Sequence, residues 1–312
     1  MFQKTIAQSR FTLTIASIIA TLAWVTHALL RPTEAATTHF GRPWSTFAVT
    51  LLVAAVAIYL MAELNNTFAL LRISSRMLST TLAMLLAMAS TLHTSLSSTI
   101  ILTAFTAAFF PLFATYQRPY ATGLSYLLYL IWGCIALLFP HFLMFVPVGW
   151  AAQIVLRSFS LKSWCASLLG LLTPCWLLFT VVFVTDHLTD WLNFVYGWLP
   201  LEWPRYDDLQ VKDIAVLGFT FLLFLLGTID FLQTSHLEKT RNRYHYYATM
   251  LYGFVAYGWM LLQPQQYSLI LPVCIVCSAI MGGHFIALSY GKVQNIITIV
   301  LTLAALGIVF IL

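Results

Sequence analysis

Charged side chains are scarce in this sequence. Lys and Arg together number 15, and Asp and Glu only 10, so that charged residues make up 8% of the 312 residues. A typical soluble domain has about 25% charged residues. A soluble fold is therefore excluded, because so few charges cannot cover a surface in water. Hydrophobic residues make up 61% of the chain and its mean hydropathy is +0.88, which indicates an integral membrane protein.

Several chemical signatures are also missing. The five cysteines all lie in or beside apolar segments, which does not suit a disulfide framework. Cys274 and Cys277 form a C-x-x-C inside an apolar run, where packing is the expected role. The absence of a glycine-rich phosphate loop and of a soluble catalytic domain excludes ATP-driven pumping by this chain alone. We expect no cofactor and no nucleic-acid partner, and no set of metal ligands stands out.

Long apolar runs are what the chain has instead. A helix needs about 20 apolar residues to cross the hydrocarbon core of a membrane. Runs near this length predict an all-α, polytopic transmembrane helical bundle of ten or eleven spans, formed as a single integral membrane domain over residues 1–312. The spans are expected near 11–30, 45–63, 77–93, 98–115, 122–138, 142–156, 165–185, 213–231, 247–263, 268–289 and 294–312. Pro140 leaves a second interpretation of residues 122–156, namely one kinked or re-entrant element instead of two spans.

Positive charges are distributed unevenly over the loops. With the N-terminus inside, eleven Lys and Arg residues fall on the inner side and four on the outer side, which is the positive-inside pattern. The inner residues are Lys4, Arg10, Arg72, Arg76, Arg118, Arg157, Lys162, Lys239, Arg241, Arg243 and Lys292. The outer residues are Arg31, Arg42, Arg205 and Lys212. We therefore predict a cytoplasmic N-terminus and a multi-pass protein of a bacterial inner membrane; an odd number of spans places Leu312 outside.

One long hydrophilic connection, the outer loop 186–212, places carboxylates among Trp and Tyr residues. Aromatic faces stack on sugar rings, and carboxylates accept hydroxyl hydrogen bonds or act as general bases. This pattern gives four candidate catalytic or sugar-binding residues. They are Asp186, Asp190, Asp207 and Asp208. The alternative is an amphipathic helix over residues 187–199 that lies on the membrane, with its acids in water.

Histidines gather at the outer ends of the predicted spans. These residues are His27, His39, His93, His141 and His187. Neutral imidazole binds zinc, copper or iron, so a metal site is one hypothesis. The spacings of known metal motifs are missing, however, and histidines at a membrane interface explain the same pattern.

Three ionisable residues, Glu63, Asp230 and His284, fall in the inner half of the predicted membrane region. A charged group there costs about 2.5–3.5 kcal/mol on insertion scales, so each should face the bundle or a wet cavity. Together they are candidates for a proton or cation pathway. The alternative is that the two carboxylates form ion pairs at the interface with Arg72, Arg76 or Lys239.

Basic residues of the inner loops form a candidate binding site for phosphate or lipid headgroups. Its members are Arg72, Arg76, Arg241 and Arg243. Guanidinium groups bind phosphate oxygens bidentately, which suits anionic lipids or a lipid-linked diphosphate. The alternative is that these charges only set the topology.

One stretch resembles a known family. The segment Arg157-Ser-Phe-Ser-Leu-Lys-Ser-Trp164, followed by Gly170-Leu-Leu-Thr-Pro174, is similar to a pattern in an uncharacterised family of multi-spanning Bacteroidetes membrane proteins. Asn65-Asn66 and Leu70-Leu71-Arg72 extend the resemblance to roughly residues 60–185. The family's acidic residue before the Trp is replaced here by Ser163. The resemblance implies membership of a membrane family but no activity. Gly170 is expected to allow a close helix approach.

Three functions fit these observations. The first is an envelope-related handling of an amphipathic or lipid-linked substrate by flipping, transfer or presentation. The inner arginines would then contact phosphate and the outer acids a saccharide, with membrane lipids and other envelope proteins as partners. The second is a non-enzymatic structural subunit of an envelope complex. The third is a membrane metalloenzyme that uses the outer histidines, and the sequence does not decide whether the chain is an enzyme.

Overall fold

The computed structural model describes residues 9, 11–30, 43–186, 189, 191–192, 203–206, 209–289 and 291–311. The regular structure in these residues is entirely helical, which confirms the predicted all-α fold. The α-helices are α2 (Thr12–Leu30), α3 (Pro43–Phe68), α4 (Met77–Met88), α5 (Ser90–Thr94), α6 (Leu96–Ala114), α7 (Thr122–Leu138), α8 (Phe145–Val155), α9 (Leu161–Val184), α11 (Val211–Thr234), α12 (Thr240–Leu262), α13 (Tyr267–Leu288) and α14 (Lys292–Ile311). Three short 3-10 helices add η1 (Pro140–Met144), η2 (Ser235–Leu237) and η3 (Pro264–Gln266). Every predicted span overlaps a helix.

Six helical segments of the described chain are long and apolar enough to cross a membrane. They are Ser45–Phe68, Leu96–Ala114, Leu161–Val184, Val211–Leu237, Pro264–Leu288 and Lys292–Val309. Further apolar helices are shorter, at 10–17 residues. The chain is therefore a multi-pass membrane protein. The number of eleven spans and the cytoplasmic N-terminus stay predictions.

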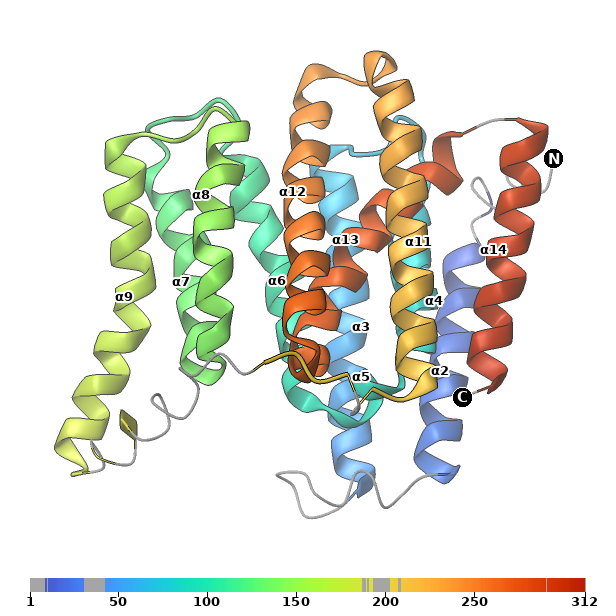
Figure 1. The fold of residues 1–312 in the computed structure, drawn as a ribbon. Coiled ribbons are helices and arrows are strands. Elements are labelled where there is room, and N and C mark those ends of the chain that lie inside the picture. The colour runs from blue at the N-terminus through green and yellow to red at the C-terminus, as the bar shows by residue number, and fades with distance from the viewer. Residues whose placement is uncertain are drawn as a thin grey trace. The chain divides into compact units, whose positions relative to one another are not determined.

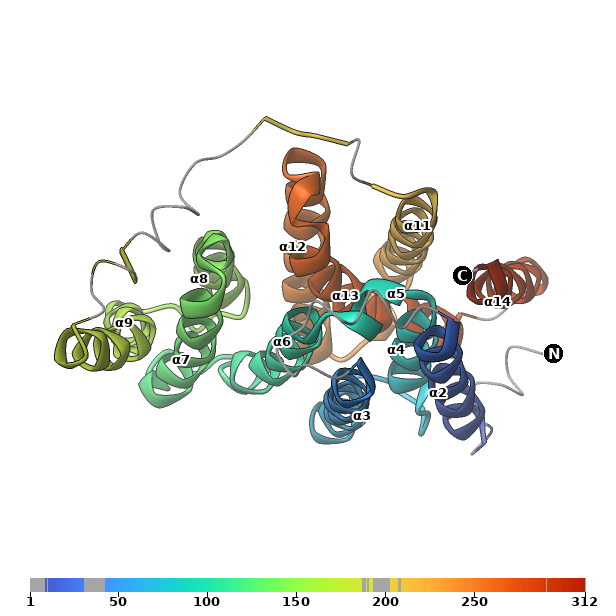
Figure 2. The ribbon, with the colours of Figure 1, turned by 90° about the horizontal axis from the view of Figure 1, so that it is seen from below.

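Contacts divide the chain into two compact units, residues 1–106 with 205–312 and residues 107–204. In the first unit, α13 lies at the centre and packs against α4, α11 and α12 (Figure 2). Glycine at position 227 lets the backbone of α11 touch the backbone of Met281 on α13. α11 and α12 run antiparallel and are joined at one end of this unit (Figure 1).

The helix predicted over residues 77–93 is broken in two. α4 ends at Met88, and Ala89, with φ −89° and ψ 81°, separates it from α5. The imidazole Nε2 of His93 lies 3.0 Å from the carbonyl oxygen of Leu86. Because a carbonyl only accepts, this ring nitrogen donates. The Leu86 carbonyl also accepts from the Ala89 amide at 3.3 Å, so both hydrogen bonds lie at the break between α4 and α5.

The second unit contains a tight pair of helices, α7 and α9. A Cβ at Gly170 would collide with the backbone of Tyr126, so the expected close approach at Gly170 is confirmed. After η1, helix α8 folds back on α7: Gln153 Nε2 donates to Ser125 Oγ at 3.1 Å. Residues 122–156 thus form two antiparallel helices joined by η1. Whether they are two spans or one re-entrant element stays a prediction.

Four helices of the described chain are followed, within three residues of their ends, by a residue with positive φ that is not glycine. Ala69 follows α3, Gln117 follows α6, Arg157 follows α8 and Asp186 follows α9, with φ between 49° and 58°. The left-handed conformation is a common helix ending and is usually occupied by glycine. For other residues it costs roughly 1–2 kcal/mol.

Candidate functional site

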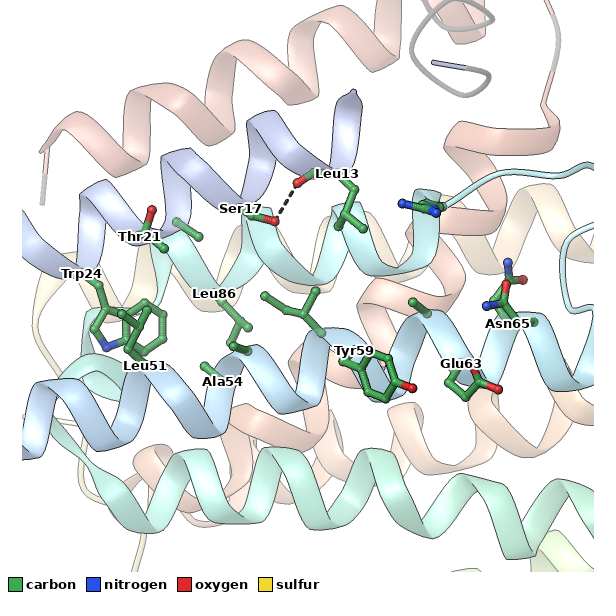
Figure 3. A pocket seen from close by; sticks show the side chains of 16 residues that line it. Leu13, Ser17, Thr21, Trp24, Leu51, Ala54, Tyr59, Glu63, Asn65 and Leu86 are labelled. Atoms are coloured by element: carbon green, nitrogen blue, oxygen red, sulfur yellow. Dashed lines mark hydrogen bonds between the residues drawn. The ribbon is translucent and has the colours of Figure 1, made fainter. Parts of the chain in front are cut away.

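A groove with a volume of about 430 Å³ lies in the first unit among α2, α3 and α4 (Figure 3). On α3 it is lined from Leu51 to Asn66, which corresponds to about 22 Å at a helical rise of 1.5 Å per residue. Trp24 and Leu51 lie at one end, and Glu63 and Asn65 lie at the other (Figure 3). The groove is therefore long, with an apolar end and a polar end.

Small side chains leave the space for this groove. They are Ser17, Ala20 and Thr21 on α2 and Ala54, Ala55 and Ala62 on α3. Small residues at helical spacing usually let transmembrane helices approach closely, but here a cavity remains between them. The indole of Trp24 is fixed at the apolar end, where its Nε1 donates to Thr50 Oγ1 at 3.2 Å. Sequence reasoning missed the groove, although the spacing of these small residues was the available signal.

The polar end of the groove lies where α3 ends and α4 begins. Glu63, Asn66 and Arg76 line it and are exposed. Thr67 Oγ1 donates to Glu63 Oε1 at 3.4 Å, which holds the carboxylate against its own helix. The structure thus places an exposed cation, an exposed anion and an exposed amide at the mouth of an apolar groove. Of the predicted headgroup-binding residues, Arg76 takes part in this mouth.

A second polar site, here called the charge cluster, comprises Arg72, Asp230, Glu238 and His284. His284 Nδ1 lies 3.8 Å from Asp230 Oδ2, and its Nε2 lies 3.5 Å from Glu238 Oε1. Glu238 Oε1 is also 2.7 Å from Arg72 Nε. The side chains of His284 and Glu238 are 0% exposed, against 11% for Asp230 and 32% for Arg72. The imidazole therefore lies between two carboxylates in a largely buried site.

Of the three ionisable residues predicted to act together, the structure brings Asp230 and His284 within 3.8 Å and places Glu63 at the groove mouth instead. Glu238 was missed by sequence reasoning. It directly precedes Lys239 and Arg241 in a basic, polar segment, which is typical of a solvated loop. No local pattern marks it as buried; only the packing of the helix ends does so.

Aromatic rings enclose the charge cluster, and a cavity reaches it. The rings of Phe231 and Tyr246 contact the His284 ring edge-on, with centroids 5.5 and 4.8 Å away. A cavity of about 470 Å³ is lined by Arg72 and Asp230. The other polar residues that line this cavity are Gln233, Thr234, Ser289 and Gln294. Two members of the cluster thus face a polar space, while His284 and Glu238 are shielded.

The two remaining predicted headgroup-binding arginines have partners within the fold. Arg241 Nη2 donates to the carbonyl of Phe68 at 2.9 Å, and Asn242 Nδ2 donates to that of Ala69 at 2.7 Å. Both bonds satisfy carbonyls that the end of α3 leaves exposed. Arg243 Nη2 donates to Thr240 Oγ1 at 3.3 Å. The contacts of Arg241 and Asn242 join the end of α3 to the start of α12, whereas that of Arg243 stays within α12.

The outer-loop acids are described only in part. Asp186 is exposed just after the end of α9. Asp190, Asp207 and Asp208 lie outside the described residues. Their catalytic or sugar-binding role stays a prediction.

The predicted histidine site receives no support from the described part of the chain. In that part no three His, Cys, Asp or Glu residues are placed so that they could hold a metal ion. His93 is buried against the indole of Trp24, with ring centroids 3.9 Å apart. The side chain of His27, and the whole of His39 and His187, lie outside the described residues.

The chain matches no protein-family model, no curated protein and no solved structure. The resemblance to a Bacteroidetes membrane family therefore stays a prediction, and function is argued below from the site alone.

Proposed function

We propose that this chain is a multi-pass protein of a bacterial inner membrane that binds and handles a lipid-linked saccharide, by flipping, transfer or presentation, with the lipid tail in the groove of α2, α3 and α4. The observation that supports this proposal is the polarity of the groove. Its small and apolar lining follows α3 for about 22 Å, and its charged residues are confined to one mouth.

The residues at the mouth favour a particular headgroup. The guanidinium of Arg76 suits a phosphate, because it can bind two phosphate oxygens at once. Glu63 would repel a headgroup that carries only negative charge, but its carboxylate accepts hydrogen bonds from hydroxyl groups. Asn66 can both donate and accept. A phosphate joined to a sugar satisfies all three residues, whereas a bare phosphate satisfies only two.

The outer-loop acids extend the same proposal. Asp186, Asp190, Asp207 and Asp208 would contact the saccharide after it reaches the outer side, as expected for flipping or for transfer to an acceptor. The groove accounts for binding without them, so the two parts can be tested separately.

The groove can be tested by native mass spectrometry of the purified protein with a polyprenyl-phosphate hexose as the probe. We expect Arg76→Gln to weaken binding about tenfold, the effect of losing about 1.4 kcal/mol from one charged hydrogen bond. Ala55→Phe should abolish binding, because it fills the groove. The matched controls are Lys239→Gln, another inner-side cation, and Val56→Phe, on the exposed face of α3; neither residue lines the groove.

Phosphatidylethanolamine and a sugar-free polyprenyl phosphate serve as competitors. Equal binding of the hexose-linked and sugar-free probes would remove the saccharide from the proposal. Displacement of the probe by phosphatidylethanolamine would reduce the groove to a site for ordinary lipid. If Ala55→Phe and Arg76→Gln bind the probe as well as their controls do, the groove is not the binding site.

A further inference from the structure

Apart from His284, the charge cluster contains three ionisable side chains, one cation and two anions. Arg72 contributes one positive charge, and Asp230 and Glu238 contribute one negative charge each when ionised. With a neutral His284 the sum is −1, in a site where two side chains are fully buried. With a protonated His284 the sum is zero, and the signs alternate along the sequence Arg72, Glu238, His284, Asp230. Burial strongly disfavours net charge, so one proton completes this cluster.

The geometry also defines a route for that proton. Asp230 lines the 470 Å³ cavity and lies 3.8 Å from His284 Nδ1, whereas Glu238 is shielded and lies 3.5 Å from Nε2. A hydronium ion in the cavity would give its proton to the Asp230 carboxylate, leaving water, and Asp230 would pass it to Nδ1. Tyr246 from α12 also faces the imidazole, and its hydroxyl donates to the Leu70 carbonyl at 3.2 Å.

The charge cluster and the groove share one loop, residues 69–76. Arg72 of this loop pairs with Glu238, and Arg76 lines the mouth of the groove. Asn65 braces the loop from α3: its Oδ1 accepts from the Leu71 amide at 3.1 Å, and its Nδ2 donates to the carbonyl of residue 75 at 3.0 Å. A change in the ion pair between Arg72 and Glu238 therefore affects a short loop that Asn65 holds in place and that ends at the groove.

We propose that the charge cluster is a proton-binding site, with His284 as the acceptor and Asp230 as the entry group, and that its occupancy sets the position of the loop 69–76. The proton completes the alternating line of charges that ties this loop to α13 and α11. Its loss leaves Asp230 without a charged partner in the line and loosens that tie. The handling of substrate in the groove is then coupled to protons. Only this last step rests on the proposed function.

Histidine-selective ¹⁵N NMR of the protein in lipid nanodiscs tests the proton site directly, without any substrate. The chain has eight histidines, and His284→Gln identifies the signals of residue 284. We expect these signals to be those of an imidazolium while the proton is bound and those of a neutral imidazole after a rise in pH removes it. In the double variant Asp230→Asn/Glu238→Gln, His284 should give the neutral signals at the same pH values.

The controls separate this result from misfolding. Glu63→Gln removes a carboxylate of the groove mouth and should leave the signals of His284 unchanged. Unchanged signals of His93, which is buried elsewhere in the same unit, show that the double variant is folded. If the double variant is misfolded, Asp230→Asn alone provides the same comparison. A His284 signal that does not respond to pH, or that is unaffected by loss of both carboxylates, would overturn the proposal.

Hydrogen exchange tests the link to the loop. After correction for the intrinsic effect of pH, we expect the amides of residues 69–76 and 230–238 to exchange several-fold faster when the proton is lost. His284→Gln should abolish this dependence. A proton signature by NMR with no change in exchange would retain the site but remove the coupling, while loss of probe binding in the groove with both results intact would remove only the proposed function.

Discussion

The helices α13 and α9 are nearly equal in sequence character and opposite in environment. Their apolar segments are 25 and 24 residues long, with mean hydropathies of 2.2 and 2.1. In α13, 94% of the apolar window is buried inside the protein, against 22% in α9. Each contains an internal proline, Pro272 or Pro174. Hydropathy therefore predicts that both helices enter a membrane, but it does not distinguish contact with protein from contact with lipid.

The difference arises from which residues meet a neighbouring helix. In α9 the buried positions form a single stripe of small residues. This stripe is Ser163, Ser167, Gly170 and Pro174. In α13 every residue from Ile270 to Leu288 is buried, because α4, α11 and α12 surround it. A helix held on one face tolerates change on the others, whereas a surrounded helix does not, and the following predictions test this contrast.

The largest effect is expected where the backbones of α11 and α13 touch. Gly227→Leu would drive a side chain into the backbone of Met281, and we expect a loss of at least about 3 kcal/mol in the free energy of unfolding, the upper end of the usual cost of overpacking. Gly218→Leu is the matched control on the same helix, because nothing lies within 4 Å of its Cβ position. Unfolding in an SDS titration measures both, and equal stability of the two variants would contradict the backbone contact.

A smaller effect is expected from large-to-small substitutions. Ile280 on α13 is 1% exposed and Leu177 on α9 is 62% exposed. Ile280→Ala should cost about 2–3 kcal/mol, because it leaves a cavity between helices. Leu177→Ala should cost less than about 0.5 kcal/mol, because lipid fills the space. The same titration compares them, and similar losses would show that α9 is also packed on that face.

The smallest effect is expected from interhelical hydrogen bonds. Tyr257 and Ser278 join α12 to α13 with 2.7 Å between their hydroxyl oxygens, in a buried setting. Tyr126 OH donates to Thr173 Oγ1 at 3.1 Å between α7 and α9, and this contact is only partly buried. We expect Tyr257→Phe to cost about 1 kcal/mol and Tyr126→Phe about half as much. A greater loss at Tyr126 would reverse the contrast between the two regions.

The sequence was sufficient for the class of protein and for most helix positions. Scarcity of charge and the length of the apolar runs determine both, and the structure agrees with them in the residues that it describes between Thr12 and Ile311. The break at Ala89 was not predicted, because neither Pro nor Gly marks it in the sequence; in the fold, the ring of His93 donates to the Leu86 carbonyl beside it. The central position of α13 was also not predictable, because the surrounding helices, not its own hydropathy, determine it.

The candidate sites show the same division. The pairing of Asp230 with His284 could have been predicted from the sequence, because ionisable groups in apolar helices usually pair with one another. The burial of Glu238 could not have been predicted, because its partner Arg72 comes from a distant part of the chain. Arg241 illustrates the point again. Its basic segment predicts a phosphate site, yet its guanidinium binds the carbonyl of Phe68, 173 residues away.

The non-glycine helix endings have a consequence for engineering. Gln117 is exposed and left-handed, with φ 54°. Glycine at this position would remove roughly 1–2 kcal/mol of backbone strain from the folded state. Part of this gain, about 0.5–1 kcal/mol, would be lost because glycine makes the unfolded chain more flexible. Substitution of glycine at such a helix ending is therefore expected to raise the free energy of unfolding. Gln117→Gly is therefore a route to a more stable protein for structural work that leaves the groove and the charge cluster unchanged.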